Sequence, residues 1–252
     1  MAKYAKPLLF TLALIPVAVV AGFFVTLYQI DGYSEEMIAE VVAQLGSIEV
    51  LLAVGVVQTV IYAAFCGFFG YILADKTGLW KPFRLSKKNL TVTLILSSIG
   101  GVAFALDYWT FGNVIDGVKE GIELLLTKNG IIGSILYGGF VEEVMLRLFF
   151  MSLIAFAIWK LFLEDRYKYS IPTAVLVIAN IVAALAFAAG HLPATMVTFG
   201  ELTPIILIRC FLYNGGLGLL FGWLYRKYGI AYAMMGHALC HIVSKVVWFI
   251  FI

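Results

Sequence analysis

Charge is scarce in this sequence: 13% of its 252 residues are Asp, Glu, Lys or Arg, whereas 63% are hydrophobic. A soluble globular domain has roughly 25% charged residues, so the composition excludes that class and indicates an integral membrane protein. The formal net charge of +2 is too small to suggest binding to nucleic acid. The apolar runs are longer than the ~9–11 alternating residues of a barrel strand, and they predict a bundle of helices.

Cysteine is also scarce, and several catalytic signatures are absent. Cys66, Cys210 and Cys240 lie in separate apolar segments, and their odd number and wide spacing provide neither a disulfide framework nor a CxxC metal site. The chain has no HExxH, which is the usual zinc signature on a helix. It also has no GxSG-type serine and no aspartate pair placed within two spans, which argues against serine and aspartyl intramembrane proteases.

Seven apolar segments are long enough to cross a membrane, which takes about 20 residues per helix. They cover about residues 7–30, 48–73, 89–111, 130–160, 171–192, 203–225 and 230–252. The apolar run of the first is too long for a signal peptide and no A-x-A site follows it, so we expect an uncleaved anchor. The predicted fold is an all-α, polytopic transmembrane bundle that forms one membrane domain, 1–252, with N-terminal helices and loops over 1–129.

The charges between these segments predict an orientation. Residues 74–88, 160–170 and 226–229 are basic, whereas residues 31–49 and 107–129 are mainly acidic. The positive-inside rule then puts the N-terminus and the basic loops in the cytoplasm and the C-terminus outside. We expect a multi-pass protein of the plasma membrane of a prokaryote.

The acidic stretch between the third and fourth spans predicts one further helix. Over residues 112–128, apolar side chains recur at helical spacing and share one face: Val114, Val118, Ile122 and Leu125. We expect this helix to lie in the membrane interface.

A cluster of three charged residues interrupts the fourth apolar run, which extends from Ile131 to Leu163. Glu142, Glu143 and Arg147 each cost at least ~2.5 kcal/mol at the bilayer centre on insertion scales, so they predict a functional site that faces a protein interior or a wet cavity. Glu143 and Arg147 are four residues apart and can pair. Glu142 points about 100° away on an α-helix, so we expect it to face the cavity; an ion-pair cluster that only fixes helix packing is the alternative.

All three histidines lie in the C-terminal spans. His191 ends the fifth span, and His237 and His241 share one face of the seventh because they are four residues apart. Three histidines and a Glu-Glu-Arg cluster in neighbouring spans favour one shared site over three separate packing residues. At 1.5 Å per residue, Glu142 and His237 come to similar depths, whereas His191 is predicted near the outer face.

Other polar residues inside the spans have more ordinary explanations. Arg209 either neutralises the spare carboxylate or extends to the outer face. Asn180 and Asn214 are expected to form hydrogen bonds between helices, and Lys245 is expected to reach the interface.

A carboxylate beside imidazoles in a cavity can activate water as a general base, and imidazole N–H groups can stabilise an oxyanion. The same side chains could instead hold Zn²⁺, which takes three protein ligands and a water in catalytic sites. The residues alone leave both mechanisms open.

Three motifs occur in a recognisable order: Glu142-Glu143-Val-Met-Leu-Arg147, Phe187-Ala-Ala-Gly-His191 and His237-Ala-Leu-Cys-His241. This order resembles the CPBP family, which comprises CAAX-processing and bacteriocin-processing-type membrane proteases and is also called the ABI family. The resemblance covers about residues 130–245 and implies a four-helix catalytic core in the C-terminal half, over 130–252.

The resemblance implies an intramembrane endopeptidase that uses a glutamate-activated water and requires no cofactor. Glu142 would activate the water, His191 would orient it, Arg147 would position Glu142 and Glu143, and His237 would stabilise the oxyanion. The expected partners are membrane lipids and a membrane-associated or lipid-linked peptide or protein substrate.

His241 is the one departure, because the family usually has Asn four residues after the last histidine. Its N–H can replace the amide, but imidazole is also the better metal ligand. A zinc-dependent version of the protease would draw its ligands from Glu142, His191, His237 and His241. A non-proteolytic membrane scaffold of the same fold is a further alternative, and a proton-coupled transporter is less favoured because the polar residues crowd into one half.

Overall fold

The computed structural model describes residues 2–167 and 170–252, and it is helical throughout most of both ranges, with no strand in either. Within these two ranges, seven helical segments are long and apolar enough to cross a membrane. They run over Tyr4–Asp31, Ile48–Thr77, Lys87–Asn113, Lys128–Phe162, Thr173–Phe199, Pro204–Tyr228 and Ile230–Phe251. The predicted polytopic bundle and its seven spans are therefore confirmed, and the chain is an integral, multi-pass membrane protein.

The N-terminal half contributes four long or medium helices and two short turns. These are α1 (Ala2–Asp31), α2 (Glu35–Leu45), α3 (Ile48–Thr77), α4 (Lys87–Ala105), η1 (Leu106–Tyr108) and η2 (Phe111–Asn113). The C-terminal half begins with α5 (Val118–Leu125) and then forms α6 (Lys128–Gly133), η3 (Ser134–Met151), α7 (Ser152–Phe162), α8 (Thr173–Gly190), α9 (Leu192–Phe199), α10 (Pro204–Cys210), η4 (Phe211–Gly215), α11 (Gly216–Tyr228) and α12 (Ile230–Phe251).

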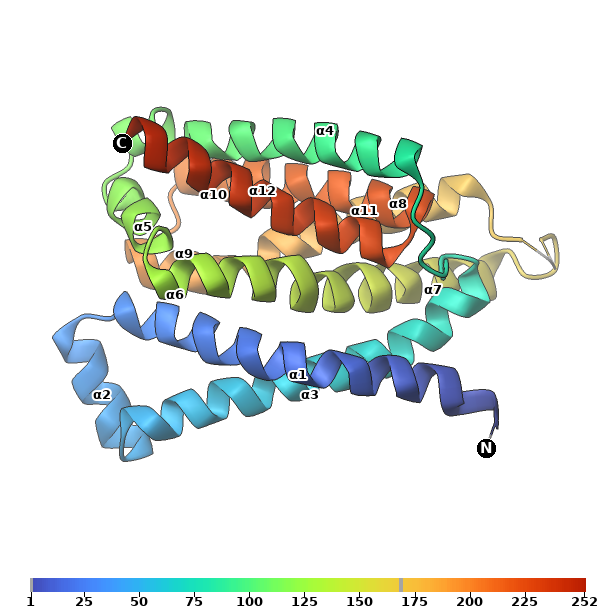
Figure 1. The fold of residues 1–252 in the computed structure, drawn as a ribbon, viewed down its shortest axis with the longest axis horizontal. Helices are drawn as coiled ribbons and strands as arrows, with labels where there is room; N and C mark the ends of the chain where they lie inside the picture. Colours follow the sequence, from blue (N-terminus) through green and yellow to red (C-terminus); the bar gives the residue numbers. More distant parts are fainter. Residues whose placement is uncertain (1, 168–169) are drawn as a thin grey trace.

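The continuous rod formed by α6, η3 and α7 is the central element of the bundle (Figure 1). α1 and α3 pack together on one side of it, and α12, which also packs on α4, lies on another. α8 packs on η3 and on α11. No residue of η3 is exposed, so the neighbouring helices cover each of its side chains at least in part.

Glycines allow the neighbouring helices to approach this rod. A Cβ atom at Gly139 would lie 2.8 Å from the Cβ of Ala238 on α12, and one at Gly138 would lie 2.8 Å from Nε2 of His241. η3 itself has the i→i+5 register of a π-helix, a rare form that is frequent at functional sites. The sequence pattern predicted an α-helix here.

The predicted helix over 112–128 is shorter in the structure. α5 begins at Val118, after Gly117 adopts a left-handed backbone with φ of 84°. Val118 and Ile122 lie on the buried face of this helix, but Val114 lies outside the helix and is 65% exposed. The prediction was wrong for residues 112–117, because the left-handed residue separates them from the helix, and for residues 126–127, because α5 ends at Leu125.

Candidate active site

Glu143 and Arg147 form the predicted pair on η3, and both are buried. Their side chains are 0% and 1% exposed, and Arg147 Nη1 lies 3.1 Å from Glu143 Oε1. Arg147 also donates a hydrogen bond from Nη2 to the carbonyl of Gly218, at 3.2 Å, and its guanidinium lies over the rings of Phe187 and Phe221. Arg147 therefore joins η3 to α11 as well as compensating the charge of Glu143.

His237 is held against the same carboxylate. Its Nδ1 lies 2.9 Å from Glu143 Oε1, and its ring stacks on Phe221 with centroids 4.3 Å apart. Because a carboxylate only accepts hydrogen bonds, Nδ1 carries a proton. Nε2 accepts a hydrogen bond in the neutral ring and donates one in the imidazolium.

His191 lies at the junction between α8 and α9. Its Nδ1 is 2.8 Å from the carbonyl oxygen of Phe187, one turn earlier. A carbonyl also only accepts, so Nδ1 of His191 carries a proton and Nε2 of its neutral ring is an acceptor as well.

The depth predicted for His191 was wrong. The fifth span continues through Pro193 to Phe199, so His191 lies inside this span rather than at its outer end. Pro193 is compatible with continuation because it occupies the first turn of α9, where a missing N–H leaves no intrahelical hydrogen bond unmade.

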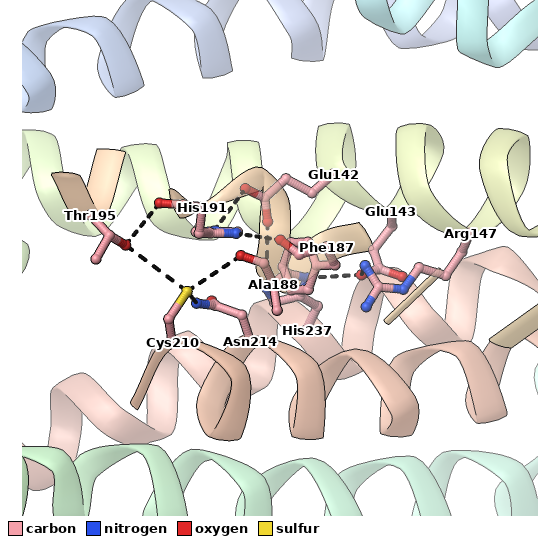
Figure 2. Close-up of polar contacts among 10 residues, drawn as sticks. All are labelled: Glu142, Glu143, Arg147, Phe187, Ala188, His191, Thr195, Cys210, Asn214 and His237. Carbon is pink, nitrogen blue, oxygen red and sulfur yellow. Dashed lines mark hydrogen bonds and ion pairs between the residues drawn. The ribbon is translucent and has the colours of Figure 1, made fainter. Parts of the chain in front are cut away.

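Glu142 is where the two imidazoles converge (Figure 2). Its Oε1 lies 3.9 Å from His191 Nε2, and its Oε2 lies 4.0 Å from His237 Nε2. The Glu142 side chain is 17% exposed and lines a cavity of about 660 Å³, which His191, His237 and His241 also line. Glu143 and Arg147 are not among the lining residues, so the predicted division between a paired and a cavity-facing glutamate is confirmed.

His241 lies on the cavity wall beyond His237. The two rings stack with centroids 5.0 Å apart, and Phe104 meets His241 edge-on. Its Nδ1 is buried and has no hydrogen-bond partner among the described residues. The structure thus brings His241 to the cavity but does not pair it with Glu142.

A metal ion would find a partial ligand set here. Within residues 2–167 and 170–252, no group of three His, Cys, Asp or Glu side chains has the arrangement that holds a metal. The Nε2 atoms of His191 and His237 nevertheless lie nearest Glu142, and their other ring nitrogens are hydrogen-bonded to a carbonyl and a carboxylate. Metal-ligating histidines characteristically have such outer partners. The types of donor therefore suit a metal ion, but Glu142, His191 and His237 would have to come closer together to bind one.

A second ion pair at the cavity was missed. Arg209 donates from Nε to both carboxylate oxygens of Asp107, at 3.0 Å, and from Nη2 to Oδ2 at 2.6 Å. Asp107 is fully buried, and Arg209 lines the cavity. Both explanations proposed for Arg209 were wrong, because its partner is Asp107, 102 residues earlier. The only signal in the sequence was that Asp107 and Arg209 are each a charged residue near one end of a predicted span.

Three other predictions for polar residues have mixed outcomes. Asn180 donates to the carbonyl of Leu219 at 3.0 Å and so joins α8 to α11, as expected. Asn214 instead donates to Cys210 Sγ, on the preceding turn of its own span. Lys245 is only 3% exposed, so it does not reach the interface; α4, α6 and η3 pack around α12. The three cysteines form no disulfide, as their spacing predicts, and all three are buried.

The comparison with protein families identifies the part of the chain that contains this site. The model of the type II CAAX prenyl endopeptidase Rce1-like family matches residues 127–243, a range that includes all six predicted site residues. No curated protein and no solved structure matches the chain. Residues 127–243 are thus similar to the Rce1-like CAAX prenyl endopeptidases, and this similarity supports the CAAX protease family that the three motifs resemble.

Proposed function

We propose that this protein is an intramembrane endopeptidase that hydrolyses a peptide bond of a membrane-associated or lipid-linked substrate, with a water activated by Glu142. The observation that carries the proposal is the convergence of His191 Nε2 and His237 Nε2 on the Glu142 carboxylate inside a cavity. The family name adds support, since it describes prenyl endopeptidases.

The separations at Glu142 suit a water-mediated arrangement. Distances of 3.9 and 4.0 Å are too long for direct hydrogen bonds, and a bridging water is the usual link at such separations. Such a water can donate one proton to Glu142 and the other to His191 Nε2, which leaves its lone pair free to attack a carbonyl carbon. Glu142 would take the proton and later deliver it to the leaving amine.

The role of His237 depends on its protonation. With Nδ1–H donated to Glu143, the neutral ring offers only a lone pair at Nε2, which cannot stabilise an oxyanion. A doubly protonated ring donates through Nε2 and forms an ion pair with Glu143. We therefore propose that His237 stabilises the oxyanion as an imidazolium, held in place by Glu143 and, through it, by Arg147.

A zinc-dependent version is the second candidate, favoured by the outer partners of the two rings. Glu142, His191 and His237 would be the three protein ligands, and His241 would be a fourth only after its ring moved. A bound zinc ion would polarise the substrate carbonyl and acidify its own water. In this version Glu143 and the carbonyl of Phe187 orient the two ligand rings.

The test is hydrolysis by purified protein in liposomes that contain quenched, lipid-anchored peptides, one of them carrying a prenylated cysteine near its C-terminus. Glu142→Gln preserves the side-chain volume but removes the base, so we expect activity to fall at least ~100-fold. Glu36→Gln is the matched control, because Glu36 is an exposed carboxylate on α2. Unchanged turnover by Glu142→Gln would refute the proposal and favour a non-proteolytic scaffold.

A further inference from the structure

The cavity lies toward one end of the bundle. Its lining includes residues from the last turn of α1, from α5 and from the last turn of α9: Tyr28, Gln29, Gly121, Thr198 and Phe199. Figure 1 shows α5 and α9 at the end of the bundle opposite to the α3–α4 and α7–α8 connections. An opening of the cavity to water therefore lies at the end that carries α5 and α9.

The opposite end is closed by packed side chains. From Arg147 toward α7, the side chains of Leu148, Met151 and Leu224 form a layer that is 0% exposed. The hydroxyls of Ser152 and Tyr225, both also fully buried, are 2.8 Å apart and join the central rod to α11. None of these five residues lines the cavity, so no passage leads from Glu142 to the α3–α4 end through this layer.

The two ends differ sharply in charge. Residues 31–47, at the open end, contain four carboxylates and no Lys or Arg. Residues 76–88, at the closed end, contain five Lys or Arg and no carboxylate. Because short cytoplasmic loops are enriched in Lys and Arg, the closed end is the cytoplasmic one.

We infer that the cavity opens to the extracytoplasmic face, and that the peptide segment cleaved at Glu142 reaches it from that face. The cavity is lined largely by apolar side chains, among them Phe104, Leu125, Phe187 and Phe199, so the segment it accepts is apolar. This inference rests on the proposed function only for what enters the cavity; the side on which the cavity opens is independent of hydrolysis.

Thiol labelling in sealed membranes tests the opening. Gly190 lines the cavity beside His191, and a Cβ atom there would meet nothing within 4 Å, so Gly190→Cys adds a thiol without a clash. Glu36→Cys marks the acidic end and Lys88→Cys marks the basic end, since both residues are exposed. Each variant is treated with a charged, membrane-impermeant maleimide in spheroplasts and in inverted vesicles, and the label is located by mass spectrometry, which separates it from the native cysteines.

We expect Gly190→Cys and Glu36→Cys to react in spheroplasts, and Lys88→Cys to react only in inverted vesicles. Reaction of Gly190→Cys from the same side as Lys88→Cys would overturn the inference, as would protection of Gly190→Cys from both sides until detergent is added. Labelling is scored without any substrate, so its outcome is separate from the loss of turnover that tests the proposed function.

Discussion

Glu143 on η3 and His237 on α12 are joined by a hydrogen bond of 2.9 Å between Oε1 and Nδ1. The same carboxylate oxygen lies 3.1 Å from Arg147 Nη1. The buried Glu143 carboxylate thus binds Arg147 on its own helix and His237 on α12. By holding His237 Nδ1, it leaves Nε2 as the ring nitrogen that points toward Glu142. The adjacent glutamates therefore differ in what they touch: Glu143 contacts protein groups only, whereas Glu142 faces the cavity.

This relationship predicts a strong dependence of stability on Arg147. Arg147→Met keeps much of the side-chain volume but removes the guanidinium from the buried Glu143 carboxylate, which is left with His237 alone as its partner. We therefore expect a loss of ~3–5 kcal/mol in the free energy of unfolding. The measurement is reversible unfolding of the purified protein in detergent micelles.

The control for this prediction is the double variant Glu143→Gln with Arg147→Met. It removes both charges, and we expect it to recover a large part of the stability lost in Arg147→Met alone. The single variant Glu143→Gln completes the comparison. If the stability losses of Glu143→Gln and Arg147→Met simply add in the double variant, the two charges are not coupled and the ion pair does not stabilise the fold.

A second prediction concerns the close approach of η3 and α12. In Gly139→Ala, the added Cβ would lie 2.8 Å from the Cβ and 3.2 Å from the Cα of Ala238. The contact involves backbone, so one helix must shift, and we expect a loss of ~1–3 kcal/mol in stability together with reduced hydrolysis. Both quantities are measured on the same purified protein.

Gly121→Ala is the matched control for this substitution. Gly121 lies in α5, and a Cβ atom there meets nothing within 4 Å. Alanine is favoured over glycine in a helix by about 1 kcal/mol, so this variant should be as stable as the wild type or more stable. Equal losses in the two variants would contradict the role of Gly139 in helix packing.

The local part of the site could be predicted from the sequence. Glu142, Glu143 and Arg147 interrupt an apolar run, and a separation of four residues suffices to predict that Glu143 and Arg147 meet. The order of the three motifs placed His191 and His237 in the same site. The pairing on the fourth span needed only helical geometry and the high free energy of a charge in lipid, whereas the shared site also depended on the resemblance of the motif order to a known family.

The long-range part could not be predicted in the same way. The depth of His191 depends on whether the chain stays helical across Pro193, which tertiary packing decides. The partner of Arg209 is Asp107 on a different span, and no spacing rule connects residues so far apart. Lys245 is buried because of the helices around α12, and these are set by the whole bundle.

The Asp107–Arg209 pair leads to a third prediction. Arg209→Gln removes the cation and leaves a fully buried carboxylate, so we expect a loss of ~3–5 kcal/mol in stability. Asp107→Asn with Arg209→Gln replaces the pair by two neutral amides and should be less destabilised than Arg209→Gln. The measurement is again unfolding in detergent, and a double variant less stable than the single one would contradict the assignment.

The last prediction separates the two versions of the protease through the removal of metal. In the preferred mechanism Glu142 activates water directly, so hydrolysis in liposomes should survive extensive dialysis against a strong chelator. In the zinc version the same treatment abolishes activity, and stoichiometric Zn²⁺ restores it.

Elemental analysis of the wild type and of His191→Gln gives a readout that does not depend on turnover. A zinc ion bound by His191 would be present in the wild type and depleted in His191→Gln. Chelator-resistant turnover with no zinc bound in either protein would support the direct mechanism. Zinc-restored turnover would replace the direct mechanism with the zinc version, and would also explain why both rings turn Nε2 toward the same carboxylate.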